Sequence, residues 1–430
     1  MRVNAKERAV REVDSLGDEI VGLCARLVRT PSVNPPGDTR DVASLLREWL
    51  GEHGYTAELH EAAPGKVSVV CRVGSGKPSL ILSGHIDTVP PGDVERWDFP
   101  PFCGELKNGK ILGRGATDMK GGVASVSGAF TASAGLVEDV GGTLTLMLVA
   151  DEEVGGRYGT EWLLERGKVS GDACIIGEPS GLKSAIVGEK GLCRIILKAR
   201  GVPAHSSIPT LGENAIEKVT EVMPVIRRAC EVSVETPEEL KGVMRESREF
   251  LIEMLRGEGV EEGRIERAVT TLNRVTVNFG VIRGGVKVNI VPDECTLHID
   301  VRVPPGTTTK ETLERIKEAV EGRDLELKVT HTSEPNYVTP ETDIFKVLRR
   351  NAEEMLGVRL RPYYMPAASD AKHFRLRGIP AIHYGPGCLT KAHAYNEYVE
   401  ADDIIKAARV IAATTIEYLG GGRRHPPTSS

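Results

Sequence analysis

The sequence predicts an α/β protein in which a mixed, largely parallel sheet forms one domain and a ferredoxin-like α+β module is inserted into it. Apolar strand-like runs alternate with helical patterns up to about residue 190 and again from about residue 335, as in parallel sheets with crossover helices. Residues 191–334 instead contain strands of alternating polarity in the order β-α-β-β-α-β. The 430 residues suffice for about two or three hydrophobic cores. We therefore expect a discontinuous first domain, residues 1–190 and 335–430, and a second domain, residues 191–334.

The amino-terminal elements follow from periodicity. Apolar residues recur at helical spacing over residues 6–29, which predicts one amphipathic helix. The proline-rich segment 31–37 ends this helix and is either a plain terminator or part of a site entrance. A second helix is expected over residues 40–52, and apolar runs at 67–73 and 79–85 predict two buried strands.

The second of these strands ends in a candidate metal-binding pair. His85 and Asp87 are two residues apart, so they point to the same side of the strand end. A metal-binding imidazole commonly has its other nitrogen held by a carboxylate or a carbonyl. Alone, a His-x-Asp pair is more often part of a turn or a surface pair, so the metal hypothesis needs support from elsewhere in the chain.

Acidic residues at three later positions give that support. Asp118 lies where a glycine-rich turn enters a helix that extends to about residue 134. The apolar strand 142–150 delivers Asp151, Glu152 and Glu153, and the next apolar strand delivers Glu178. The alternatives are a helix N-cap for Asp118 and solvated strand ends for the others. However, crowded acids next to buried strands are costly unless cations share the space.

The remaining elements complete the two predicted domains. A strand over residues 191–199 opens the second domain, and a charged insertion at about 233–268 predicts surface helices. We expect the other elements at residues 214–230 (helix), 274–282 and 288–303 (strands), 309–320 (helix), 325–330 (strand), 342–356 (helix) and 380–384 (strand), followed by a final helix after residue 398.

Composition excludes several classes of protein. The net charge is −6 and the basic residues are scattered, so no nucleic-acid partner is expected. The eight cysteines form no Cys-x-x-Cys pair and most lie in apolar runs, which indicates reduced core residues. The charged amino terminus and the lack of a long apolar span predict neither secretion nor membrane insertion. A cytoplasmic protein is expected.

Five motifs, in this order and at this spacing, resemble a known family. The family is that of the dizinc amidohydrolases, which includes aminoacylase-1, succinyl-diaminopimelate desuccinylase, acetylornithine deacetylase and bacterial glutamate carboxypeptidases. The resemblance covers nearly the whole chain except its tails and the insertion at 233–268. The motifs are Ser83-Gly84-His85-Ile86-Asp87, Gly115-Ala116-Thr117-Asp118-Met119, Asp151-Glu152-Glu153, Gly177-Glu178-Pro179 and Lys391-Ala392-His393.

The resemblance implies a site for two Zn²⁺ ions. His85 and Glu178 would bind one ion, Glu153 and His393 the other, and Asp118 would bridge both, with a water between the ions. Cobalt or manganese would fit the same ligands. The peptide bond after Asp118 is expected to be cis.

The resemblance also implies roles next to the metals. Glu152 would be the general base, which takes a proton from the water and returns it to the leaving nitrogen. Asp87 would orient His85 without binding metal. His205 matches a histidine that, in dimeric members, reaches into the partner's active site and stabilises the oxyanion. A homodimer that pairs through the second domain is therefore expected.

Substrate binding is assigned by the same resemblance. Arg302 and Asn289 match positions that hold the substrate carboxylate, and the planar fork of arginine suits that task. The loop with Gly385 and Gly387 would shape the same pocket. Without the family, a strand-end arginine and a turn asparagine would be the plainer interpretations.

The expected function is metal-dependent hydrolysis of the amide bond of an N-acyl amino acid. The first domain would be catalytic and the second a lid and dimerisation domain. A dipeptidase, tripeptidase or carboxypeptidase on the same dizinc core is the alternative, and a catalytically silent metal-binding scaffold is a third possibility. The sequence does not define the acyl group or the native metal.

Overall fold

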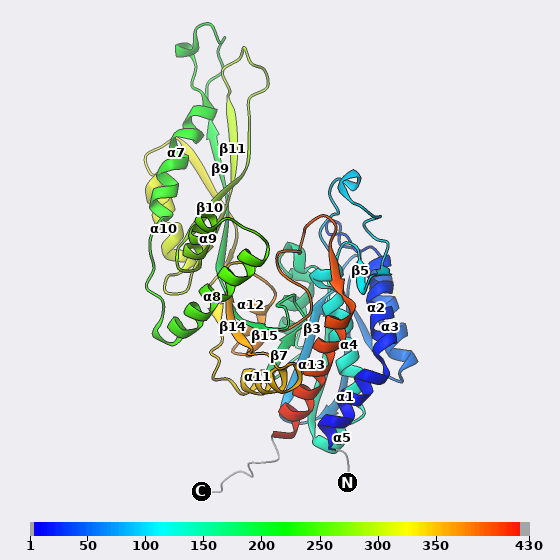
Figure 1. Ribbon diagram of the computed structural model, residues 1–430. Coiled ribbons are helices and arrows are strands. Elements are labelled where there is room, and N and C mark those ends of the chain that lie inside the picture. Colours follow the sequence, from blue (N-terminus) through cyan, green and yellow to red (C-terminus); the bar gives the residue numbers. More distant parts are fainter. Residues whose placement is uncertain (1–3, 422–430) are drawn as a thin grey trace. The chain divides into compact units, whose positions relative to one another are not determined.

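The computed structural model describes residues 4–421 and contains two compact units (Figure 1). Among the described residues, unit 1 comprises 4–187, Val338–Pro362 and 369–421. Unit 2 comprises Gly188–Tyr337 and Tyr363–Ala368. Within residues 4–421, no helix is both long enough and apolar enough to span a membrane.

Unit 1 is built on a mixed sheet with the strand order β1-β2-β6-β3-β7-β15-β8. The central strands β6, β3, β7 and β15 run parallel, whereas β1, β2 and β8 pair antiparallel with their neighbours. This arrangement confirms the predicted mixed α/β fold with a parallel centre. The strands are β1 (Glu58–Ala63), β2 (Lys66–Ser75), β3 (Ser79–His85), β6 (Gly142–Val149), β7 (Ala173–Ile176), β8 (Ser184–Glu189) and β15 (Ala381–His383).

The amino-terminal pattern forms two helices, so the prediction of a single helix over residues 6–29 is wrong. Helix α1 ends where Leu16 leaves helical geometry, and α2 begins at Gly17, a residue that favours helix interruption. The helices of unit 1 are α1 (Ala5–Ser15), α2 (Gly17–Arg29), α3 (Arg40–Glu52), α4 (Gly121–Ala134), α5 (Val137–Val140), α6 (Trp162–Glu165), α11 (Asp343–Leu356), α12 (Ala371–Arg375) and α13 (Ala401–Gly421).

Helix α4 is buried along its whole length and packs against α1, α2, α13 and strand β3 (Figure 1). Its composition of glycine, alanine and serine allows this close packing. A Cβ atom on Gly122 would lie 1.7 Å from the carbonyl oxygen of Gly177, just after β7. The start of α4 is therefore in backbone contact with the carboxyl end of β7.

A small sheet joins two distant parts of unit 1. Its strands are β4 (Glu105–Lys107), β5 (Lys110–Leu112) and β16 (Tyr398–Glu400), in the order β16-β5-β4. Asn108 and Gly109 connect β4 to β5 with positive φ angles, as a tight hairpin requires. Because β5 pairs with β16, the turn between β5 and α4 is held close to the loop that precedes β16.

Unit 2 contains an antiparallel sheet in the order β10-β11-β9-β12, with α7 and α10 packed on it around one hydrophobic core. Apart from α8 and α9, which lie in or beside the charged insertion, the strand and helix order is the predicted β-α-β-β-α-β. The elements are β9 (Gly191–Arg200), α7 (Ala215–Cys230), α8 (Lys241–Gly257), α9 (Glu262–Thr270), β10 (Thr276–Gly284), β11 (Glu294–Val303), α10 (Thr309–Val320), β12 (Leu325–Ser333) and β13 (Asn336–Tyr337). Strand β14 (Arg361–Met365) carries the chain from unit 1 into unit 2.

The predicted strand 288–303 is too long. Strand β11 starts only at Glu294, because Pro292 has no N–H for a sheet ladder and the preceding residues form a loop. In this loop the backbone N–H of Val291 donates to the carbonyl oxygen of Ala204, so two loops of unit 2 lie side by side.

The close approach of α4 to β7 generates a stability prediction. Gly122→Ala is expected to lower the free energy of unfolding by about 1–3 kcal/mol, because a new methyl group would collide with backbone that cannot rotate away. Gly22→Ala in α2 is the control: its Cβ meets nothing within 4 Å, so about 0.5–1 kcal/mol of added stability is expected. Thermal and denaturant unfolding would measure both. Equal stability of the two variants would contradict this packing argument.

Candidate metal centre

Five segments of unit 1 bring the predicted ligands together. His85 is the last residue of β3, and Glu178 follows β7. Asp118 lies in the turn Ala116–Lys120 before α4, and Glu153 lies in the helical turn Glu152–Val154 after β6. His393 comes from the loop before β16, at a backbone φ of 60°. The parallel strands thus deliver three of the five residues at one edge of the sheet.

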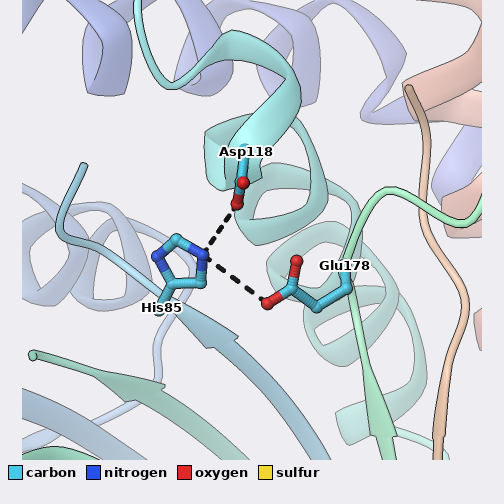
Figure 2. A group of neighbouring side chains, drawn as sticks. All are labelled: His85, Asp118 and Glu178. Atoms are coloured by element: carbon cyan, nitrogen blue, oxygen red, sulfur yellow. Dashed lines mark hydrogen bonds and ion pairs between the residues drawn. The ribbon is translucent and has the colours of Figure 1, made fainter. Parts of the chain in front are cut away.

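The five side chains form two groups that share Asp118. In the first group, His85 Nε2 lies 2.9 Å from Asp118 Oδ1 and 3.6 Å from Glu178 Oε1 (Figure 2). In the second group, His393 Nε2 lies 3.3 Å from Asp118 Oδ2 and 3.3 Å from Glu153 Oε2. Within each group all donor atoms lie within 4.8 Å of one another. The two oxygens of Asp118 therefore face different groups, as a bridging ligand requires.

The three carboxylates of this cluster carry more negative charge than its two imidazoles can balance. Burial raises the pKa of the Glu178 carboxyl to about 8, and the neighbouring charge of Asp118 adds to this effect. Hydrogen bonds to Asp118 and Glu153 raise the pKa of His393 to about 10. Burial opposes the charge on His85, yet its bond to Asp118 and the charge of Glu178 raise its pKa well above the usual value. Without a cation, the protonated forms of Glu178, His85 and His393 are therefore favoured.

Divalent cations fit this donor set. Two imidazoles and three carboxylates provide the mixed nitrogen and oxygen ligands that zinc, cobalt and manganese accept. A cation in each group would neutralise the buried carboxylates without the protons. The clustered residues can therefore hold two ions, one on each side of Asp118.

Asp87 forms hydrogen bonds with residues of the cluster. His85 Nδ1 lies 3.0 Å from the backbone carbonyl oxygen of Asp87, and the Asp87 carboxylate is farther away, at 3.7 Å. That carboxylate accepts the backbone N–H groups of Glu152 and Glu153 at 3.1 and 3.2 Å. Asn34 Nδ2 donates to it at 2.8 Å. Asp87 therefore contacts both the first histidine and the turn that carries the two glutamates.

Glu152 adjoins the cluster, next to Glu153 in the turn after β6. Burial raises the pKa of its carboxyl well above the usual value; the charge of His85 opposes this shift, and nearby Asp370 and Glu178 add to it. A carboxyl with a raised pKa, close to two ligand groups, is suited to take up and release a proton.

The predicted loop glycines also lie at the cluster. A Cβ atom on Gly385 would lie 2.8 Å from the carbonyl oxygen of Glu178, and one on Gly387 would lie 3.0 Å from Thr117 Cγ2. The loop therefore packs against the segments that carry Glu178 and Asp118. The peptide bond between Asp118 and Met119 is cis, as the resemblance implies.

The three remaining predicted residues belong to unit 2. The exposed His205 and the half-buried Asn289 lie on the paired loops: Ser206 N donates to the Asn289 carbonyl oxygen at 3.1 Å. The side-chain Oδ1 of Asn289 has no hydrogen-bond partner in residues 4–421. Arg302 lies near the carboxyl end of β11, where its Nε donates to Asp300 Oδ1 at 2.7 Å. Within one chain, Asn289 and Arg302 are thus at opposite ends of β11.

Three residues at the centre were missed from the sequence. Asn34 sits in the proline-rich segment and binds Asp87, whereas Arg114 and Glu397 form a buried ion pair next to Asp118. Two features of the sequence could have indicated this ion pair. Arg114 is a charged residue inside the glycine-rich run Gly113-Arg114-Gly115, and Glu397 is an acid four residues after His393.

Comparison with known proteins identifies relatives over almost the whole chain. The profile of peptidase family M20/M25/M40 matches residues 81–417. The chain is 27% identical to a probable succinyl-diaminopimelate desuccinylase of Staphylococcus aureus, covering 93% of this chain and 98% of that one. It is 28% identical to an acetylornithine deacetylase of Pectobacterium carotovorum, covering 93% and 97%.

Solved structures share the fold at lower identity. A metallo-carboxypeptidase from Sulfolobus solfataricus has a TM-score of 0.79 at 21% identity, covering 93% of this chain and 99% of that chain. A dinuclear metal-binding peptidase from Bacillus subtilis has a TM-score of 0.62 at 14% identity, covering 94% and 99%.

The shared position of Asp118 generates a metal-binding prediction. A chelator-treated sample of the parent protein is expected to bind two divalent ions per chain, and Asp118→Asn is expected to weaken both, because each oxygen of Asp118 faces a different group. Asp172→Asn is the control, since Asp172 is a hydrogen-bonded carboxylate at the other end of β3. Isothermal titration with metal analysis would count the ions. A variant of Asp118 that still binds two ions with parent affinity would exclude the bridging arrangement.

Proposed function

The chain belongs to peptidase family M20/M25/M40 and is a hydrolase of amide bonds, and from this premise we propose that it deacylates N-acyl amino acids with the aid of two Zn²⁺ ions. The proposed reaction is of the acetylornithine deacetylase or succinyl-diaminopimelate desuccinylase type, after the relatives that align over 93% of this chain. The observation that carries the metal part is the pair of ligand groups that meet at Asp118.

The residues of unit 1 have distinct proposed roles. His85, Asp118 and Glu178 would hold one ion, and Asp118, Glu153 and His393 the other. When bound, the ions would polarise the scissile carbonyl and lower the pKa of a water. Zinc suits the mixed donors, and cobalt or manganese would substitute.

Glu152 is the proposed proton carrier. Its carboxylate would accept a proton from the attacking water and return it to the leaving nitrogen. The Asp87 carboxylate accepts the backbone N–H groups of Glu152 and Glu153. These bonds fix the position of the proposed base relative to the proposed ligand. In this assignment unit 1 is the catalytic domain and unit 2 the lid and dimerisation domain.

Substrate recognition requires a free carboxylate. Arg302 and Asn289 are the proposed carboxylate-binding residues, and the loop of Gly385 and Gly387 the proposed pocket wall. Strand β11 separates Asn289 from Arg302 by roughly 25 Å within one chain. One small substrate cannot contact both residues of the same copy, which favours a site completed by a second copy.

An exposed apolar surface on unit 2 supports a homodimer. Leu211, Val286 and Val288 are 72%, 86% and 97% exposed, and all lie on or beside the loops that carry His205 and Asn289. Such apolar exposure at one place is typical of an interaction surface. The proposed partner is a second copy, whose His205 would stabilise the oxyanion.

A cytoplasmic location is proposed as well. The cysteines in residues 4–421 are all free thiols, and most of them are buried. Reduced thiols are typical of proteins in a reducing compartment.

The alternative function is peptide hydrolysis. The similar solved structures include a metallo-carboxypeptidase, although identity of 21% carries only the fold. Assays of the metal-loaded enzyme on acetylornithine, succinyl-diaminopimelate and dipeptides would decide. Turnover of dipeptides alone would favour the peptidase, and turnover of no amide would reject both.

The assignment of Glu152 predicts a loss of catalysis without loss of metal. Glu152→Gln is expected to lower kcat by about 10²- to 10⁴-fold, because the amide cannot accept the proton. Metal content should stay at the parent level, which metal analysis would check. Glu165→Gln removes an exposed acid of the same unit and should leave kcat unchanged. A metal-loaded Glu152 variant with parent turnover would reject the proposed base.

The shared active site predicts complementation between two inactive variants. His205→Ala and Glu152→Gln should each be nearly inactive, but a mixed dimer contains one site with an intact Glu152 and a partner's His205. Random exchange should therefore restore up to about a quarter of parent activity. Kinetic assays after mixing would measure this. In contrast, no recovery from mixed dimers isolated with two affinity tags would show that His205 acts within its own chain.

A further inference from the structure

Arg114 and Glu397 form a buried ion pair that belongs to neither ligand group. They are 2% and 1% exposed, and Arg114 Nη1 donates to Glu397 Oε2. Arg114 follows β5 and Glu397 precedes β16, the two strands that pair in the small sheet. The pair thus joins segments that are far apart in the sequence.

The carboxylate of Glu397 holds the backbone of the shared ligand. Its Oε1 accepts the N–H groups of Thr117 and Asp118 at 2.9 and 3.0 Å. These bonds fix the turn from which the Asp118 side chain extends toward both groups. Asp118 is therefore held at its backbone by one glutamate, while its own oxygens are left for ligation.

The guanidinium of Arg114 reaches the loop of the other histidine. Its Nη2 donates to the backbone carbonyl oxygen of His393 at 3.4 Å, and it lies 5.1 Å from the ring centre of Trp97. The His393 side chain is 54% exposed and is carried by a loop with positive φ, so packing alone does not fix it. Arg114 supplies a link from this loop to Glu397, and through it to Asp118.

We propose that Arg114 and Glu397 are positioning residues that set the separation between Asp118 and His393, and hence the affinity of the second ligand group for its ion. This inference rests on the proposed dizinc site. Outer residues that orient ligands typically contribute about 10- to 100-fold to metal affinity. The pair is suited to this because its hydrogen bonds go to the backbone of both ligand segments.

A purely structural role is the competing explanation. A buried ion pair often contributes little stability compared with an apolar replacement, and removal of one partner leaves an uncompensated charge. A lower Tm of a single variant therefore supports neither explanation. Metal affinity and the geometry of the bound ion must be measured separately from stability.

The experiment uses the full chain, freed of metal by chelation and titrated with Co²⁺. Arg114→Met is expected to weaken binding of Co²⁺ at the second ligand group by about 10- to 100-fold. It should also change the visible absorption spectrum of this bound Co²⁺, which reports ligand geometry. The control is Arg375→Met, which removes a buried guanidinium that donates to the carbonyl oxygens of Ala381 and Ile186 in the same unit. This control should lower stability but keep both affinities and the spectrum.

Two further variants keep the inference testable if Arg114→Met does not fold. Arg114→Lys keeps the charge and should show an intermediate affinity. The double variant Arg114→Met with Glu397→Gln removes both charges, so its Tm should be higher than that of Arg114→Met alone. Binding of Co²⁺ at the second ligand group should stay weak. Parent affinity in the double variant or in Arg114→Lys, or an equal loss in Arg375→Met, would overturn the proposal. If the parent binds two ions but hydrolyses no amide, the proposed function fails and this inference still stands.

Discussion

The crowding of buried carboxylates at one edge of the sheet governs the structure of unit 1. Asp118, Glu153 and Glu178 face the same small space, and Glu152 adjoins them. Asp87 is more deeply buried, but three N–H donors satisfy it: two from the backbone and one from Asn34. The clustered acids have few such donors, so their charge must be balanced by protons on the imidazoles or by metal ions.

The scaffold achieves this crowding by close backbone contact. Parallel strands end at a common edge, which places His85, Glu153 and Glu178 near one another. The glycines at the start of α4 let the turn with Asp118 approach β7 until its backbone touches Gly177. The hairpin of β4 and β5 then pairs with β16 and brings the loop of His393 to the same edge.

Sequence patterns predicted the parts of this structure that depend on local periodicity. Apolar runs located the strands whose ends carry His85 and Glu178, and the family motifs supplied Asp118 and His393, which lie in turns without periodicity. The break at Leu16 was missed because apolar spacing continues through it, and the late start of β11 was missed although Pro292 signals it. The pairing of Arg114 with Glu397 spans 283 residues, and one sequence gives no sign of such a contact.

The order in which the strands of unit 1 occur along the chain has a consequence for biosynthesis. Strand β15, at residues 381–383, lies between β7 and β8 in the sheet, and His393 and Glu397 come later still. A nascent chain emerges from the ribosome amino terminus first. His85, Asp118 and Glu178 are therefore made long before the sheet and the second ligand group can close. The second ligand group can form only after the segment that carries His393 has been synthesised.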